Sequence, residues 1–287
     1  MTDSIVYLNG DYLPVNEAKV PVLDRGFIFG DGIYEVIPVY GGKLFRLEEH
    51  LQRLDNSLNA IQVSNPFNHH EWAALLETLL THNPCYTDQS VYVQITRGVA
   101  MRDHGFPPGV TPTVFAMANP LVTTPAEQLE KGAAAITVPD IRWQNCHIKA
   151  IALLPNILMR QQALDQGAME AIFVRDGNVT EGAASNIFIV QNGAIKTPPK
   201  SNYLLPGITR DLVVELAHAN GMACHETTIR DTELTTADEI WLTSSTKEVM
   251  PVTRLDDQPV GNGIPGPVWQ QMYGIFQTYK ASLRKGA

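Results

Sequence analysis

Residues 179–188 read VTEGAASNIF, in which one acid is followed by small residues and then by an apolar run. The apolar end is typical of a buried strand. The small residues allow a planar ligand or another backbone to approach closely. The carboxylate of Glu181 can hold a ring nitrogen protonated at such a place. The alternative is an ordinary turn at residues 180–182, and the local sequence taken alone favours that turn.

Segments on both sides of this stretch predict an alternation of strands and helices. The turn pairs at residues 9–10 and 41–42 separate short apolar runs and predict two N-terminal hairpins. Recurrent leucines at helical spacing predict helices, and apolar or alternating runs predict further strands. The expected helices cover residues 47–61, 65–82, 151–166 and 209–219, and the expected strands cover 90–97, 113–118, 134–138, 171–175, 186–190 and 239–243.

The chain length and one proline-containing segment predict two domains. A chain of 287 residues is long enough for two. Residues 119–126 hold two prolines and two threonines and show little periodicity, which favours a linker. We therefore expect a small N-terminal α/β domain over 1–118 and a larger, strand-rich C-terminal α/β domain over 127–287. The fold class expected is α/β or α+β.

Composition narrows the classes of partner and the compartment. A net charge of −9 makes nucleic acid or an anionic membrane a poor partner. Cys85, Cys146 and Cys224 are scattered and form no CxxC pair, so the sequence predicts neither a disulfide framework nor a cysteine-based metal site. Residues 1–4 do not resemble the start of a signal peptide. No apolar run reaches the ~18–20 residues that a membrane helix needs. These features predict a cytoplasmic protein.

Lys149 lies in an otherwise apolar stretch, HIKAIALL at residues 147–154. Apolar surroundings favour the neutral form of a lysine. A neutral amine is a nucleophile that can form a Schiff base with an aldehyde. The alternative is a lysine that extends from a strand edge into water, and the local sequence favours this simpler interpretation.

Two further segments suit an anionic phosphate. Residues 205–212, LPGITRDL, resemble a loop that enters a helix, where free backbone N–H groups and the Thr209 hydroxyl can bind phosphate. Residues 243–246 place four hydroxyl side chains after an apolar run. The alternatives are an ordinary helix cap at Thr209 and a solvated turn at 243–246.

Arg102 and His104 lie on a segment bounded by glycine and proline, TRGVAMRDHGFP at residues 96–107. An arginine can bind a carboxylate through two parallel hydrogen bonds. A solvent-facing loop charge is the alternative.

Taken in order, these stretches resemble the fold-type IV pyridoxal-phosphate enzymes, a family of aminotransferases and lyases. The resemblance runs from Tyr7 to Val252 and adds the stretches DRGFIFGDGIYEV at 24–36 and DIRW at 140–143. Within the family it is strongest to members that act on D-amino acids. It implies transamination between D-amino acids of the D-alanine and D-glutamate type and 2-oxo acids such as 2-oxoglutarate and pyruvate. It also implies a small N-terminal domain and a larger pseudo-barrel domain.

The resemblance assigns roles to individual residues. Lys149 would be the catalytic residue, bonded to pyridoxal 5′-phosphate as a Schiff base and moving the proton at the substrate Cα. Glu181 would pair with the pyridine nitrogen, and Leu205 would support one face of the ring. The residues that would hold the cofactor phosphate are Arg53, Ile208, Thr209, Ser244 and Ser245.

The substrate carboxylate would be bound by Tyr34, Arg102 and His104, with Val36 also lining the substrate site. In this family the arginine and the histidine come from the neighbouring subunit, which implies a homodimer. The alternatives are another reaction of the same family, namely that of a branched-chain aminotransferase, an (R)-amine transaminase or an aminodeoxychorismate lyase. Arg102 and His104 argue against these. A catalytically idle binding protein is a third alternative, against which the presence of both Lys149 and Glu181 argues.

Overall fold

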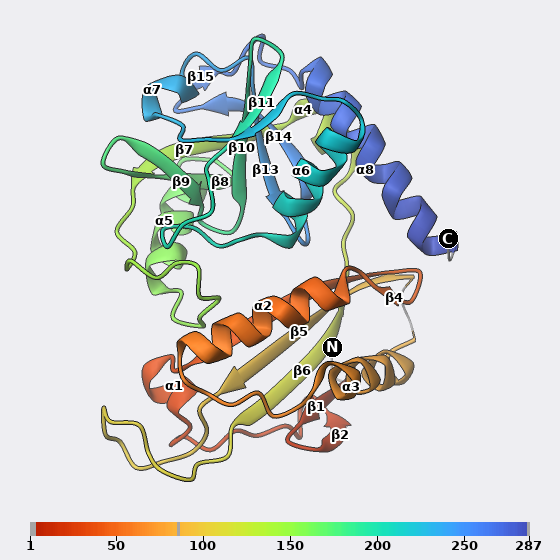
Figure 1. The fold of residues 1–287 in the computed structure, drawn as a ribbon, viewed down its shortest axis with the longest axis vertical. Coiled ribbons are helices and arrows are strands. Elements are labelled where there is room, and N and C mark those ends of the chain that lie inside the picture. Colours follow the sequence, from red (N-terminus) through yellow and green to blue (C-terminus); the bar gives the residue numbers. More distant parts are fainter. Residues whose placement is uncertain (1–3, 85–86, 286–287) are drawn as a thin grey trace. The chain divides into compact units, whose positions relative to one another are not determined.

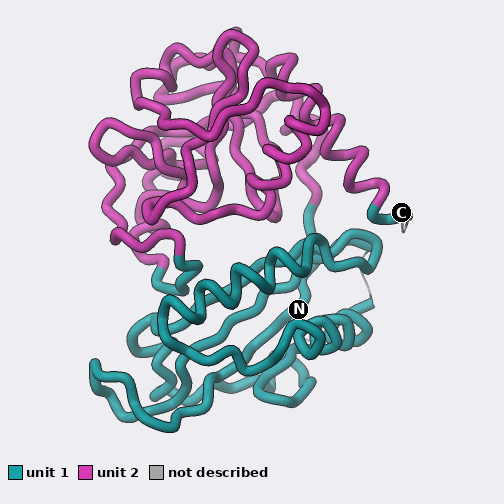
Figure 2. The backbone as a smooth tube through the Cα atoms, viewed as in Figure 1, with its two compact units in different colours: residues 1–122, 148–152, 283–287 teal, residues 123–147, 153–282 magenta. Residues whose placement is uncertain are grey.

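The computed structural model describes residues 4–84 and 87–285, so Cys85 lies outside the described residues. The chain forms two compact units, coloured separately in Figure 2. The N-terminal unit comprises residues 1–122, 148–152 and 283–287, and the C-terminal unit comprises 123–147 and 153–282. The catalytic lysine predicted at position 149 therefore belongs to the N-terminal unit, although its flanking segments belong to the other one.

The N-terminal unit is built on an antiparallel sheet with the strand order β2-β1-β6-β5-β3-β4 (Figure 1). Its first hairpin turns at Asn9 and Gly10, both with positive φ, as predicted for an Asn-Gly turn. The elements are β1 (Ile5–Leu8), β2 (Asp11–Pro14), α1 (Arg25–Phe29), β3 (Gly32–Tyr40), β4 (Lys43–Leu44), α2 (Leu47–Ala60), α3 (His69–His82), β5 (Asp88–Thr96) and β6 (Thr113–Pro120).

Helices α2 and α3 pack on one face of this sheet and enclose its core. Leucines at helical spacing, among them Leu54 and Leu76, meet the odd-numbered residues of β3 such as Ile33 and Ile37. Helix α3 begins at residue 69, later than the predicted residue 65. The reason is the capping box at Asn68, whose side chain accepts a hydrogen bond from the backbone N–H of residue 71 while that glutamate binds back.

The C-terminal unit contains a larger mixed sheet with the path β12-β11-β10-β13-β14-β7-β8-β9, and β15 pairs with β14. The neighbours β14, β7 and β8 are parallel, which the sequence did not predict. Strand β9 also contacts β10, so the sheet curls back on itself. Its strands are β7 (Ala133–Pro139), β8 (Glu170–Arg175), β9 (Asn178–Gly182), β10 (Asn186–Gln191), β11 (Ala194–Thr197), β12 (Cys224–Glu226), β13 (Glu239–Ser244), β14 (Glu248–Leu255) and β15 (Gln258–Pro259).

The helices accompanying this sheet are α4 (Ala126–Lys131), α5 (Leu154–Asp165), α6 (Ile208–Ala219), α7 (Asp231–Leu234) and α8 (Pro267–Lys285). Helix α5 begins three residues later than predicted, because Leu153 is its N-cap and residues 148–152 pair elsewhere. Its residue Ala163 packs against Ala171 and Phe173 of β8. Among the described residues, none of the helices combines the length and apolarity needed to cross a membrane.

Candidate active site

The segment that carries Lys149 completes the free edge of β3 in the N-terminal unit. The Tyr34 N–H donates to the Lys149 carbonyl at 2.9 Å, and the Ile151 N–H donates to the Gly32 carbonyl at 3.1 Å. The Ser57 hydroxyl of α2 accepts the Lys149 N–H at 3.2 Å. These bonds satisfy edge groups that would otherwise need another strand or water. The lysine backbone is therefore fixed on both sides.

The side chains of Lys149 and Tyr34 meet. The Lys149 Nζ lies 4.1 Å from the centroid of the Tyr34 ring, a cation–π geometry. Tyr34 stacks in turn on Tyr92, with centroids 5.8 Å apart. Burial raises the pKa of Tyr92 to about 12, so that neighbour stays a neutral phenol. The structure thus brings together the predicted catalytic lysine and one predicted substrate-binding residue, and Val36 shares the Tyr34 face because side chains alternate along β3.

The opposite face of β3 carries a buried charge cluster. Glu35 receives two hydrogen bonds of 2.7 Å from Arg53, and its carboxylate lies 2.8 Å from the His50 Nδ1. Burial opposes ionisation of Glu35, but the charge and hydrogen bonds of Arg53 outweigh it and lower the pKa of this carboxyl. The guanidinium of Arg53 is consequently held in one orientation, and its role at a phosphate stays a prediction.

Arg102 and His104 gather around the ring of Phe29. The Arg102 guanidinium lies 5.4 Å from the ring centroid, and the His104 ring lies at the same centroid distance of 5.4 Å. Arg25 also lies over Phe29 and donates to the Asp103 carbonyl at 2.6 Å, which anchors the loop. Among the described residues, no hydrogen bond, ion pair or ring contact joins Arg102 or His104 to the Lys149 pair.

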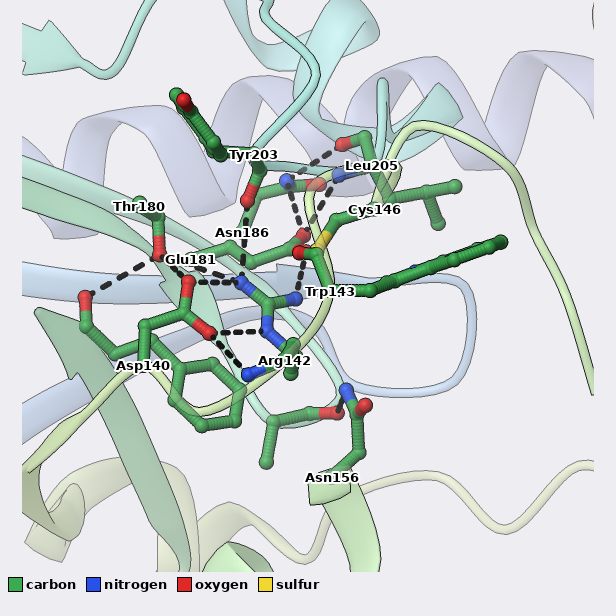
Figure 3. Close-up of polar contacts among 12 residues, drawn as sticks. Asp140, Arg142, Trp143, Cys146, Asn156, Thr180, Glu181, Asn186, Tyr203 and Leu205 are labelled. Atoms are coloured by element: carbon green, nitrogen blue, oxygen red, sulfur yellow. Dashed lines mark hydrogen bonds and ion pairs between the residues drawn. The ribbon is translucent and has the colours of Figure 1, made fainter. Parts of the chain in front are cut away.

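Glu181, in the C-terminal unit, is a buried carboxylate surrounded by donors (Figure 3). Its Oε1 accepts a hydrogen bond from Arg142, and its Oε2 accepts the Leu205 N–H at 3.0 Å and the Asn186 amide at 3.4 Å. The Asn186 amide also donates to the Leu205 carbonyl at 2.9 Å. Leu205 is predicted to support the ring of a cofactor, and its backbone N–H is hydrogen-bonded to Glu181, the residue predicted to pair with the ring nitrogen.

An ion pair between Arg142 and Asp140 adjoins Glu181. Arg142 forms two hydrogen bonds of 2.9 Å with the carboxylate of Asp140, which Arg175 also contacts at 3.2 Å. Burial opposes ionisation of Asp140, but Arg142 outweighs it and lowers the pKa of this carboxyl. Burial also opposes the charge of Arg142, and Asp140 and Glu181 together raise the pKa of its guanidinium. A cation beside Glu181 favours the ionised carboxylate.

Sequence reasoning did not identify Arg142, Asp140 or Asn186 as functional. Arg142 is 39 residues from Glu181 in the chain, so nothing local joins them. A signal was nevertheless present in the DIRW stretch at 140–143, where an acid and an arginine stand two residues apart beside apolar side chains.

Helix α6 begins at a buried, uncapped N-terminus. Gly207 is the N-cap and provides no side-chain hydrogen bond, while Ile208 and Thr209 in the first turn are buried. A Cβ on Gly207 would stand 2.0 Å from the Asn186 Oδ1, so only glycine allows this approach. The first N–H groups of a helix lack intrahelical partners, and they bind anions well.

The predicted hydroxyl cluster lies at the end of β13. Ser244 is the last residue of β13 and Ser245 begins the turn to β14; both are half-buried, and the Ser244 Oγ accepts the Lys247 N–H at 3.1 Å. Thr243 pairs with Asn186 across the ladder, which puts both on one face of the sheet. Within the described part of the chain, the buried Thr243 hydroxyl has no hydrogen-bond partner. A buried polar atom of this kind indicates a missing polar group.

Comparisons with known proteins identify the family and the fold of this chain. The family model for amino-transferase class IV matches residues 32–255. A D-alanine aminotransferase of Bacillus licheniformis is 40% identical over 272 residues, covering 95% of both chains. One of Staphylococcus haemolyticus is 42% identical over 275 residues, covering 96% of this chain and 97% of the relative. The solved branched-chain amino acid aminotransferase of Escherichia coli has a TM-score of 0.90 at 27% identity, covering 96% of this chain and 94% of that one.

Proposed function

The chain belongs to the class IV aminotransferases, and from this we propose that it exchanges amino groups between D-amino acids and 2-oxo acids. D-Alanine and D-glutamate are the expected donors, and pyruvate and 2-oxoglutarate the expected acceptors. The observation that carries the proposal is the match to relatives named D-alanine aminotransferase, at about 40% identity over nearly the whole chain.

Pyridoxal 5′-phosphate is the cofactor of this family, and the residues present fit it. Glu181 is a buried hydrogen-bond acceptor held by Arg142, which suits a protonated ring nitrogen. The uncapped start of α6 and the unpartnered Thr243 hydroxyl suit phosphate oxygens. Ser244 and Ser245 lie next to Thr243 in the chain, so their predicted place at the phosphate is part of the proposal.

The cofactor, when bound, supplies an aldehyde that reacts with amines and a ring that withdraws electrons from the substrate Cα. Lys149 would take the proton from Cα with its Nζ and deliver it to the cofactor carbon that carried the aldehyde oxygen. The Tyr34 ring and the fixed lysine backbone orient this amine before the substrate arrives. Glu181 would hold the proton on the ring nitrogen, and the Arg142 hydrogen bond to its Oε1 would keep the carboxylate in place.

We further propose that Arg102 and His104 reach the active site of a second copy of this chain and bind the carboxylate of the substrate there. Among the described residues, no hydrogen bond, ion pair or ring contact joins either of them to Lys149 or Tyr34, yet both lie against the ring of Phe29. Exposed apolar side chains flank them: Phe27 is 76% exposed and Met101 is 78% exposed. Such a surface favours association, because covering it removes apolar area from water. A homodimer would complete both sites.

The visible spectrum of the purified protein tests the substrate assignment. D-Alanine and L-alanine are added in separate experiments, without an acceptor, and the cofactor band is followed. We expect D-alanine alone to bleach the band. Arg102→Ala should raise the KM for D-alanine and leave the spectrum of the resting enzyme unchanged, because the residue would touch the substrate and not the cofactor.

The branched-chain aminotransferase neighbours define the second candidate reaction. If L-leucine bleaches the band and D-alanine does not, the D-substrate assignment and the role of Arg102 and His104 are wrong, while the family assignment stands. A protein that binds no pyridoxal 5′-phosphate would contradict the proposed activity itself.

A further inference from the structure

Glu170 is a buried carboxylate that the proposed mechanism does not use. It is the first residue of β8, and its side chain is 0% exposed. Its Oε2 accepts a hydrogen bond of 2.9 Å from the Ser185 hydroxyl and one of 3.3 Å from the Lys247 ammonium. Its Oε1 lies 3.6 Å from the Arg160 guanidinium of α5. One carboxylate therefore joins three segments that are remote in sequence.

Two of these segments are turns at the same end of the β10–β13 ladder. The turn at 182–185 follows Glu181 and leads into Asn186, and the turn at 244–247 carries Ser244 and Ser245. Asn186 and Thr243 face each other as the last pair of that ladder. The turns therefore leave the sheet side by side, one from each strand.

The first turn is shaped around the Glu170 side chain. The Gly182 N–H donates to the Ser185 carbonyl at 2.7 Å, which closes the turn. A Cβ at Gly182 would stand 2.3 Å from the Ser185 Oγ and 3.1 Å from the Glu170 Cγ. Any larger residue would push the hydroxyl away from the carboxylate, so the glycine permits the contact.

The second turn is held through a charge. The Lys247 ammonium is mostly buried, and burial lowers its pKa while Glu170 opposes that shift. An apolar pair of the same volume would usually be at least as stable as a buried ion pair, and the best-attested use of such a pair is to select one arrangement of segments. Glu170 has no hydrogen bond to Glu181, Ser244 or Ser245 among the described residues.

We propose that Glu170 is a positioning residue that fixes the separation between the turn after Glu181 and the turn that carries Ser244 and Ser245. This inference rests on the proposed function, in which the first turn follows the group at the cofactor ring and the second holds the phosphate. A fixed separation matches the site to a ligand that has both ring and phosphate, because each end then binds without further rearrangement.

Two ligands that differ only in the phosphate test this role. Dissociation constants of pyridoxamine and pyridoxamine 5′-phosphate are measured on the full-length chain stripped of cofactor, so that neither catalysis nor bonding to Lys149 contributes. The ratio of interest is the dissociation constant of pyridoxamine divided by that of pyridoxamine 5′-phosphate. In Glu170→Gln, we expect this ratio to fall at least tenfold, because the phosphate-bearing ligand binds more weakly. Pyridoxamine itself should bind within threefold of wild type. Arg160 also lies near the Glu170 carboxylate, but it belongs to α5 and to neither turn. Arg160→Met is therefore the matched control and should leave the ratio unchanged.

Other variants keep the test decisive. Ser185→Ala and Lys247→Met each remove one arm of the connection, and both should lower the ratio even if Glu170→Gln does not fold. An unchanged ratio in all three variants, or an equal loss for both ligands, would overturn the proposal. A loss confined to Lys247→Met would also overturn it, because that lysine would then bind the phosphate directly. If the wild-type chain binds neither ligand, the proposed function fails first.

Discussion

Replacing Arg142 by methionine is expected to destabilise the C-terminal unit strongly. The guanidinium is 4% exposed, and it binds the fully buried carboxylate of Asp140 through two hydrogen bonds and Glu181 through another. Removing one partner of a buried ion pair costs about 3–5 kcal/mol. Without Arg142, Asp140 keeps the Arg175 contact at 3.2 Å, and Glu181 loses its arginine. Screening by water reduces this figure little, since the Arg142 side chain is 4% exposed and that of Asp140 is 0% exposed.

A double-mutant cycle with Asp140→Asn isolates the pair. We expect each single substitution to lower the free energy of unfolding by about 3–5 kcal/mol. The double variant should lose about 1–3 kcal/mol less than the sum, because no uncompensated charge of that pair remains. Urea unfolding at fixed pH and ionic strength measures all four proteins. Arg254→Met is the control: its exposed pair with Asp257 should be worth at most about 1 kcal/mol.

Two results would refute this reasoning. A loss of less than about 1 kcal/mol in Arg142→Met would place that guanidinium among surface ion pairs. Losses that add within about 0.5 kcal/mol would show that Arg142 and Asp140 act independently.

Three further outcomes are expected. Burial lowers the pKa of His50, so the unfolded chain binds more protons than the folded one below pH ~6.5, and stability should fall as the pH drops. The free energy of unfolding, measured between pH 7.5 and 5, should decrease by at most about 1.4 kcal/mol per pH unit, and this slope should be smaller in His50→Gln. Lys149→Ala should abolish transamination while circular dichroism stays unchanged, and full turnover would contradict the role of that amine. Gly207→Ala should force the Asn186 amide to move, which should lower stability by about 1–3 kcal/mol and weaken the binding of pyridoxamine 5′-phosphate. Calorimetry measures the stability and titration measures the binding. Wild-type values in both would argue against a close approach at Gly207.

Local features of the fold were predictable because their causes are local. The Asn192-Gly193 turn between β10 and β11 has positive φ at both residues, the geometry that this dipeptide favours between strands. Helix α2 was predicted within one residue because its leucines recur at helical spacing. Strand β4 covers only Lys43–Leu44, and Leu47 already begins α2. The domain limits 1–118 and 127–287 stay a prediction.

Non-local features were not predictable from one sequence. Helix α8 carries Trp269, Met272 and Phe276 on its buried face, a helical spacing that went unrecognised between polar residues. The parallel pairing of β7 with β14 joins strands far apart in the chain. The support of Glu181 by Arg142 likewise depends on tertiary structure. The family resemblance supplied the site residues, and their individual roles remain predictions.

The short segment at 148–152 has a consequence for how such proteins can be rearranged in evolution. It fills the edge of β3 in the N-terminal unit, yet it is encoded within the stretch that builds the other unit. A recombination event that replaced residues 1–122 as a contiguous gene fragment would not replace residues 148–152, so the recipient chain would keep its own lysine segment. The transplanted sheet would then have to accept a foreign segment at the Tyr34 N–H and the Gly32 carbonyl. Exchange should succeed only between chains whose lysine segment and third strand match, so these two stretches are expected to be inherited together.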